Sequence, residues 1–192
     1  MYIASNPAQI RIDVVHFLLS DRKDLILLAG AVAIGGILAV YNPWAALVVL
    51  GIGVAMGVIS IFQARTAFAE GDACPAIVVD PERNLIAVYT DLTKGGSPRP
   101  VVKVLKQPLG RVAGGPFQRR ARLAFAALYN GFPQEPTWRN FGGYLANAGT
   151  RDEAVIERIV RRIPDYQWDV LEGAVASMAT PVKPGLYELR EP

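Results

Sequence analysis

The chain has 192 residues, a net charge of +3 and a hydrophobic content of 52%, and only 19% of its residues are charged. An ordinary soluble domain has about 25% charged residues, and disordered chains combine low hydrophobicity with high net charge. The composition therefore excludes a disordered chain and argues against a wholly water-soluble monomer. The single cysteine excludes an intramolecular disulfide, and the single histidine excludes a metal site built from several histidines.

An N-terminal segment, residues 1–24, precedes the first long apolar stretch. Apolar residues follow Pro7 at helical spacing and predict a short amphipathic helix within residues 7–20, although residues 10–14 also alternate like a strand. We expect this helix to lie at a membrane interface; packing on a folded domain is the alternative. His16 has neither a second histidine nor a nearby cysteine, so we interpret it as structural.

Residues 25–62 contain no Asp, Glu, Lys, Arg or His. The stretch is divided at Tyr41-Asn42-Pro43-Trp44, where Asn-Pro favours a turn and aromatic rings are typical of the headgroup level. The two arms, 25–41 and 45–62, are at the short end of the range of about 17–25 residues that spans a bilayer. The pattern predicts a transmembrane helical hairpin; a buried hairpin in a soluble helical core is the alternative.

Small residues recur every four positions in both arms, at Ala31, Gly35 and Ala39 and at Gly53 and Gly57. Such spacing lets two helix backbones approach closely in lipid. It predicts a packing seam within the hairpin, and a homodimer through Gly53 and Gly57 is the alternative use of the same residues.

Basic residues lie beside the open ends of the predicted hairpin, at Arg11, Arg22, Lys23 and Arg65, and the turn carries none. Because cytoplasmic loops are enriched in Lys and Arg, this asymmetry predicts a multi-pass protein of the cell membrane with both termini in the cytoplasm.

Residues 70–192 read as a cytoplasmic α+β domain with an antiparallel sheet and two C-terminal helices. Short apolar runs bounded by turn residues predict strands at 75–79, 85–90, 101–105 and 123–129, with a fifth at 144–148 and an edge strand at 186–189. A capping box at Thr150–Glu153 begins a predicted helix that Pro164 ends, and a second helix runs to about Ser177. The order of strands before helices indicates the α+β class.

Between Leu92 and Gln134 the chain has eight basic residues and no acidic ones. We predict a basic face for anionic lipid or for an acidic protein partner, with its best contact residues at Lys103, Lys106, Arg119, Arg120 and Arg122. The alternative is that these side chains are solvated positions paired with the acidic flanking segments. No recognition motif or aromatic RNA-binding pattern accompanies the charge, so nucleic acid is not an expected partner.

No catalytic, metal-binding or cofactor-binding signature is present in the sequence. The loop Gly110–Pro116 lacks the GxxxxGK[ST] pattern of a phosphate-binding loop. Asp91, Lys94 and Cys74 are the polar groups that an enzyme acting on a lipid or a small anionic substrate would use. We therefore predict a membrane-anchored binding or scaffold module without a cofactor or metal; such an enzyme, or a structural subunit of a membrane complex, are the alternatives.

The layout resembles an uncharacterised bacterial family of membrane-anchored proteins with a two-helix hairpin, classed only as a domain of unknown function. The likeness is carried by Thr90-Asp91-Leu92-Thr93, Val101-Val102-Lys103-Val104-Leu105, Gln107-Pro108-Leu109, Gly114-Gly115-Pro116, Ala127-Leu128-Tyr129, Trp138 and Pro184-Gly185-Leu186-Tyr187. The resemblance implies a bacterial membrane context and supplies no catalytic residue.

Overall fold

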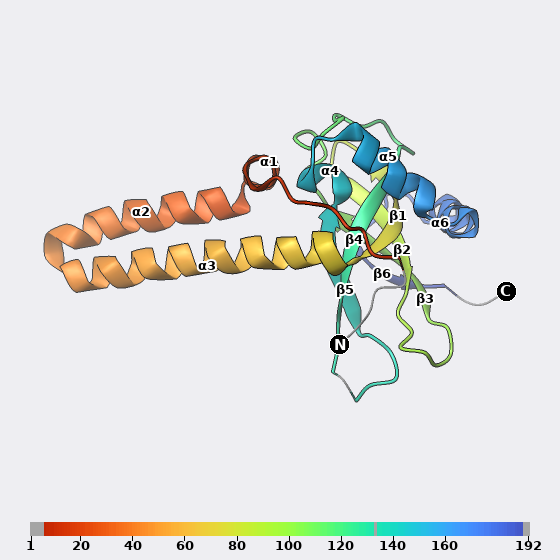
Figure 1. Ribbon diagram of the computed structural model, residues 1–192, viewed down its shortest axis with the longest axis horizontal. Coiled ribbons are helices and arrows are strands. Elements are labelled where there is room, and N and C mark those ends of the chain that lie inside the picture. Colours follow the sequence, from red (N-terminus) through yellow and green to blue (C-terminus); the bar gives the residue numbers. More distant parts are fainter. Residues whose placement is uncertain (1–5, 133, 190–192) are drawn as a thin grey trace.

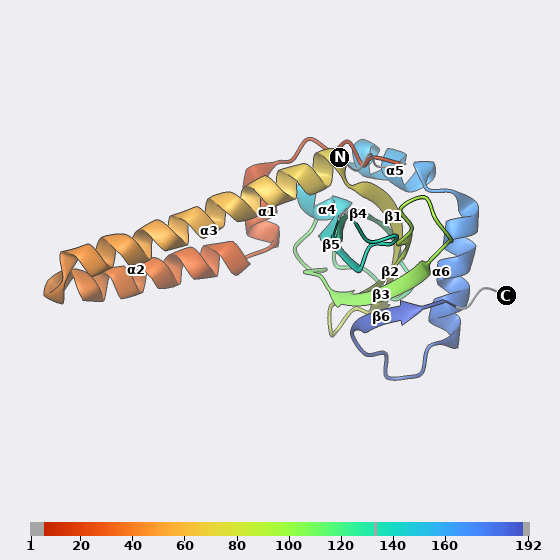
Figure 2. The ribbon, with the colours of Figure 1, turned by 90° about the horizontal axis from the view of Figure 1, so that it is seen from below.

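The computed structural model describes residues 6–132 and 134–189, and it consists of a helical hairpin followed by an α+β domain (Figure 1). The chain opens with α1 (Val14–Ser20), α2 (Lys23–Tyr41) and α3 (Pro43–Glu70). Helices α2 and α3 lie side by side and project away from the rest of the molecule (Figures 1 and 2). Between them, the Asn42 side chain accepts hydrogen bonds from the backbone of Trp44 and Ala45, and Pro43 occupies the first turn of α3. The turn predicted at 41–44 is confirmed.

Large apolar side chains are exposed along the hairpin; Val40 is 80% exposed, Trp44 77% and Phe62 70%. Water-soluble monomers rarely expose so long an apolar surface. Helix α3 is long and apolar enough to cross a membrane, and α1 with α2, bent by 81°, forms a second candidate if the bent pair is one span. The described residues therefore contain one or two candidate membrane-spanning helices.

The small residues of the hairpin pack the two helices together. A Cβ atom on Gly53 would lie 2.6 Å from Cβ of Ala31, and one on Gly35 would lie 3.0 Å from Cγ of Leu50. Gly53 therefore belongs to a seam within the hairpin, whereas open space lies beside Gly57. The homodimer through Gly53 and Gly57 stays a prediction.

Within the described residues, six strands form one antiparallel sheet in the order β5-β4-β1-β2-β3-β6. The strands are β1 (Asp72–Asp80), β2 (Leu85–Asp91), β3 (Pro100–Lys106), β4 (Arg122–Asn130), β5 (Asn140–Leu145) and β6 (Gly185–Glu188). The α+β class, the first four predicted strands and the C-terminal edge strand are confirmed.

The fifth strand lies earlier than predicted: β5 ends at Leu145, and residues of the predicted strand 144–148 form the short helix α4 (Ala146–Gly149) instead. Gly142 and Gly143 made this strand difficult to predict from residue propensities, because glycine is depleted in strands. Gly143 has φ +147°, and a Cβ atom there would collide with the carbonyl oxygen of Ala126 on β4. A glycine is therefore needed for β5 to pair closely with β4.

The sheet curls, and both of its faces are buried (Figure 2). The inner face holds a core that includes Val88, Phe125 and Phe141. The outer face is covered by α5 (Glu153–Arg162) and α6 (Asp165–Ser177), which contribute Ile159, Trp168 and Leu171 to a second core. The two predicted C-terminal helices are confirmed, but the N-cap of α5 is Asp152 and not Thr150; its side chain accepts from the backbone of Ala154 and Val155.

Residues 7–13 are not helical, so the helix predicted over 7–20 begins only at Val14, where Asp13 caps it. The alternation of residues 10–14 does not give a strand either, because residues 8–13 are irregular and Val14 is helical. Two backbone hydrogen bonds still hold this segment to the domain: the Ala8 N–H donates to Gly71 O (2.9 Å) and the Ile10 N–H donates to Phe68 O (2.8 Å). In α1, the buried Phe17 ring meets Phe68 at 6.1 Å and Tyr144 at 5.1 Å, both edge to face. The N-terminal segment thus packs on the folded domain and joins it to the base of the hairpin.

Substitution of Gly149 tests this junction. In Gly149→Ala the new Cβ atom would lie 2.8 Å from two atoms of the buried Phe68 ring, so we expect a loss of about 1–3 kcal/mol in the free energy of unfolding. Gly173→Ala in α6 is the control: it meets open space, so we expect a gain of about 0.5–1 kcal/mol. Thermal unfolding of the full chain in detergent measures both, and equal effects would contradict the packing at the junction.

Candidate functional site

The five basic residues predicted for ligand contact lie in three places. Lys103 and Lys106 are three residues apart on β3, and such positions on a strand point to opposite faces. Arg119 and Arg120 lie in the loop before β4, and Arg122 begins that strand. These positions therefore have different surroundings.

Lys103 connects β3 to β5 across the curled sheet. Its Nζ donates to Asn140 Oδ1 (2.9 Å) and to the Phe141 carbonyl, both on β5, and lies 5.2 Å from the centroid of the Phe141 ring. Burial lowers the pKa of the Lys103 ammonium from its ordinary value. This side chain holds β3 against β5, and its charge is already used by these contacts.

Arg122 connects the sheet to α6. Its guanidinium donates to Glu172 Oε1 from Nε (2.8 Å) and from a terminal nitrogen (2.5 Å), and it stacks 5.0 Å from the centroid of the Trp168 ring. These contacts fix the side chain between β4 and α6, so the charge of Arg122 is paired.

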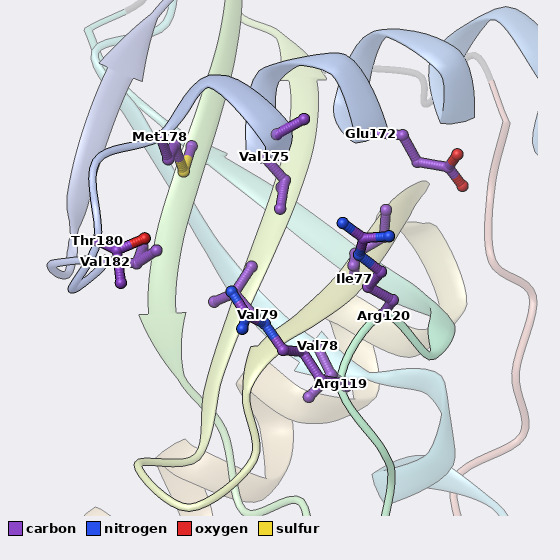
Figure 3. Close-up of a pocket in the computed structure, with 11 residues that line it drawn as sticks. Ile77, Val78, Val79, Arg119, Arg120, Glu172, Val175, Met178, Thr180 and Val182 are labelled. Carbon is purple, nitrogen blue, oxygen red and sulfur yellow. The ribbon is translucent and has the colours of Figure 1, made fainter.

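Arg119 and Arg120 line a groove beside α6 with a volume of about 380 Å³, which we call the α6 groove (Figure 3). Strand β1 contributes Ile77–Val79, and α6 with the segment after it contributes Glu172, Val175, Ala176, Met178, Thr180 and Val182. Both arginines are exposed, and no ion pair involves either of them among the residues that the structure describes. The groove thus combines a partly apolar lining with two unneutralised positive charges.

The backbone at Arg120 is held in an unusual conformation. Its φ is +69°, a left-handed value that few residues other than glycine adopt. Two hydrogen bonds to β1 maintain it: the Arg120 N–H donates to Val78 O (2.7 Å), and the Val78 N–H donates to Ala121 O (3.1 Å). Such strained residues cluster at functional sites, which makes the α6 groove a candidate binding site.

Lys106 lines a second concavity, at the base of the hairpin, with a volume of about 640 Å³. We call it the hairpin-base pocket; Asp21, Lys23, Asn84, Gln107, Pro108, Gly110 and Arg111 complete its lining. The sequence does not predict that Lys23 shares a pocket with Lys106 and Arg111, because about eighty residues separate Lys23 from the other two. From the sequence, Lys23 contributes only to the predicted membrane orientation.

The α6 groove and the hairpin-base pocket lie on different sides of the domain. In both views the hairpin leaves the domain on one side and α6 lies on the opposite side (Figures 1 and 2). The predicted basic residues therefore contribute to two sites, one near the hairpin and one far from it, while Lys103 and Arg122 have structural contacts.

Cys74 is buried in the inner core. Its Sγ lies 3.5 Å from Thr90 Oγ1 and 4.0 Å from the Tyr129 hydroxyl. Burial, the dominant cause, raises the pKa of the Cys74 thiol to about 12. A nucleophilic cysteine needs a lowered pKa and access, so these surroundings indicate a structural thiol.

The other two polar groups named for the enzyme alternative also make local contacts. The Asp91 carboxylate accepts hydrogen bonds from the N–H groups of Thr93 (2.9 Å) and Arg99 (2.8 Å). Lys94 donates to Phe132 O (2.5 Å) and lies 4.1 Å from the centroid of the Trp138 ring. These contacts organise the two loops beside β2 and β5. Within residues 6–132 and 134–189, no group of three His, Cys, Asp or Glu side chains could hold a metal ion.

His16 connects α1 to the domain. Its Nε2 lies 2.9 Å from the Asn147 carbonyl, and Arg151 Nε donates to its Nδ1 at 3.1 Å. Since a carbonyl only accepts and a guanidinium only donates, these contacts fit the tautomer in which Nε2 carries the ring proton. The structural interpretation of His16 agrees with these contacts.

Comparison with known proteins identifies the family. Residues 60–178, more than half of the chain, match the family model "Protein of unknown function (DUF3239)". The chain belongs to the DUF3239 family. The resemblance to a bacterial domain of unknown function is thereby confirmed.

One solved structure resembles this DUF3239 chain, the "Crystal structure of a putative membrane protein from Corynebacterium diphtheriae". It matches with a TM-score of 0.50 and 20% identity over 62% of this chain and 100% of that chain. At this identity the likeness supports the fold and carries no assignment of residues. No curated protein matches the chain.

The contrast between Lys103 and Lys106 is open to test. In Lys103→Ala the Phe141 carbonyl loses its lysine donor, and we expect about 1–3 kcal/mol less free energy of unfolding. Lys106→Ala removes an exposed charge, and we expect a change within about 0.5 kcal/mol. Urea unfolding of the full chain in detergent, followed by tryptophan fluorescence, compares the free energies of unfolding of the two variants. A Lys103→Ala variant as stable as Lys106→Ala would contradict the role of Lys103 in holding β3 against β5.

Proposed function

We propose that this DUF3239 protein is a membrane-anchored binding module. Its hairpin crosses the cell membrane twice, both termini and the curled-sheet domain lie in the cytoplasm, and the α6 groove receives an acidic segment of a partner protein. The anchor and the binding surface are separate properties of the molecule and can be tested separately.

The anchor is supported by the surface of the hairpin. Its large apolar side chains point outward and are exposed, which is costly in water and favourable in lipid. Tyr41 and Trp44, at the turn, are 83% and 77% exposed and suit the far headgroup region. Arg22, Lys23 and Arg65 are all at the base, and no charged residue lies at the turn, which favours a cytoplasmic base.

The observation that carries the binding function is the pair of unneutralised arginines beside the partly apolar α6 groove. Positive charge next to half-buried apolar side chains, such as those of Val175, Met178 and Val182, is complementary to a peptide segment that alternates acidic and apolar residues. Helix α6, which forms one wall of the groove, lies on the side of the domain away from the hairpin (Figures 1 and 2), which favours a protein partner over the membrane surface. Electrostatic attraction to a lipid surface falls off within about 8–10 Å at physiological salt.

Single-cysteine labelling tests the anchor, since the native Cys74 is buried. We expect a membrane-impermeant maleimide to label Tyr41→Cys at the turn in intact bacterial cells, because the turn faces outward. Ser97→Cys, in an exposed loop of the domain, is the matched control and should react only after the cells are permeabilised. Labelling of Ser97→Cys in intact cells, or extraction of the chain by alkaline carbonate, would contradict the proposed topology.

Peptide binding tests the groove. A fluorescent peptide of alternating Glu and Leu residues is titrated with the full chain in neutral detergent, and fluorescence anisotropy measures the dissociation constant. We expect the double variant Arg119→Ala/Arg120→Ala to weaken binding about tenfold, if each exposed charge pair contributes about 0.7 kcal/mol.

The matched control for this titration is Lys106→Ala/Arg111→Ala, which removes two charges in the hairpin-base pocket. We expect it to leave the affinity within about twofold of the unaltered chain. Equal weakening by the two double variants would mean that the peptide responds to net charge alone, and would contradict a site in the α6 groove.

A further inference from the structure

The hairpin-base pocket lies where the predicted membrane helix meets the soluble domain. Lys23 is the first residue of α2, and the stretch without charged residues begins two positions later, at Leu25. Lys106 and Arg111 come from the end of β3 and the loop that follows it. The fold therefore brings two distant basic residues to the start of a candidate membrane span.

Hydrogen bonds on two sides hold the wall of this pocket in place. Asn84, in the turn between β1 and β2, accepts from the Gln107 N–H through its carbonyl (2.9 Å) and from the Leu109 N–H through its side chain (3.2 Å). On the other side, Ser20 Oγ at the end of α1 donates to the Arg111 carbonyl (3.1 Å). The loop that carries Arg111 is thus tied both to the sheet and to the hairpin base, and the pocket is formed before any ligand binds.

The charges of the pocket favour an anion. Three basic residues line it, against the single carboxylate of Asp21, which pairs with Lys23 Nζ at 2.9 Å. Lys106 and Arg111 are exposed, and neither side chain has an ion pair among residues 6–132 and 134–189. Two positive charges therefore remain for a ligand. The volume of about 640 Å³ is within the usual range of about 300–1,000 Å³ for small-molecule sites.

We infer that the hairpin-base pocket binds the phosphate headgroup of an anionic phospholipid from the membrane leaflet next to the domain, through Lys106 and Arg111 with Lys23 at its edge. This inference rests on the proposed membrane insertion of the hairpin. Basic pockets on the cytoplasmic side of membrane helices are suited to acidic headgroups. Soluble phosphate esters have the same chemistry as the headgroup, but a lipid fits the position better.

The position of the pocket favours a lipid, because the basic pocket for the headgroup and the apolar surface of α2 for the acyl chains lie next to each other. Ile26 and Leu27, in the first turns of α2, are 68% and 49% exposed. A phosphate held by Lys106 and Arg111 leaves the acyl chains to continue along this apolar helix, in the direction that the hairpin takes. A soluble phosphate ester would gain nothing from these exposed side chains.

Lipid titration with native mass spectrometry tests the inference. The full chain in neutral detergent with phosphatidylcholine is titrated with phosphatidylglycerol, and the occupancy of bound phosphatidylglycerol gives its affinity. Each basic residue close to a headgroup contributes about fivefold in affinity, the equivalent of about 1 kcal/mol. We expect Lys106→Ala/Arg111→Ala to bind phosphatidylglycerol about 25-fold more weakly than the unaltered chain.

Arg119→Ala/Arg120→Ala loses the same two charges at the α6 groove and should change this affinity less than about threefold. Equal losses in the two double variants, or no loss in Lys106→Ala/Arg111→Ala, would overturn the site. Thermal unfolding of both variants establishes that they are folded. A third variant, Arg111→Lys, keeps the charge and should retain most of the binding.

Soluble glycerol phosphate distinguishes the source of the phosphate. We expect millimolar glycerol phosphate to leave bound phosphatidylglycerol in place; displacement at concentrations comparable to those of the lipid would overturn a lipid site in favour of a soluble ester. Detergent micelles present the lipid headgroup whether or not the hairpin spans a bilayer. The lipid titration, which tests the pocket, and the maleimide labelling, which tests the membrane topology, can therefore fail independently.

Discussion

The aromatic contact of Phe68 with Phe17 and Tyr144 fixes the hairpin to the domain, and the arrangement of both candidate sites depends on it. Phe68 is on the last turns of α3, and its ring is fully buried between a helix that precedes the hairpin and a strand that follows it. Because α3 is one continuous helix from the turn into this core, the direction of the hairpin is set by the packing of its final turns. That direction decides which surfaces lie near its base and which lie far from it.

The curl of the sheet determines which contacts the basic residues make. A partly buried charge is costly unless it is paired, and Lys103 has the partners that this requires, a carbonyl and an amide oxygen. Arg122 is exposed and pairs with the Glu172 carboxylate. Both stabilise the domain by connecting β3 to β5 and β4 to α6. Of the five basic residues predicted for ligand contact, Arg119 and Arg120 in the α6 groove and Lys106 in the hairpin-base pocket have no ion pair among the described residues.

The proposed functions use these two sites differently. A lipid headgroup in the hairpin-base pocket would hold the domain at a defined distance and angle to the membrane, since the pocket walls belong to both the hairpin and the sheet. The α6 groove would then face the cytoplasm, where a soluble partner can reach it. In this arrangement the anionic lipid and the acidic partner do not compete, although both are attracted by positive charge.

The sequence by itself determined the hairpin, the first four strands, the edge strand and the two C-terminal helices, because each depends on neighbours along the chain: missing charge, alternation or helical spacing. It also showed a resemblance to a bacterial family of unknown function, which the family model identifies as DUF3239. Only the tertiary structure decided where α1 begins, that Gly142-Gly143 belongs to a strand, and which lysines and arginines meet. Lys23 and Arg111 line the same pocket because Ser20, at the end of α1, hydrogen-bonds the loop that carries Arg111, and no local sequence pattern records an interaction between segments so far apart.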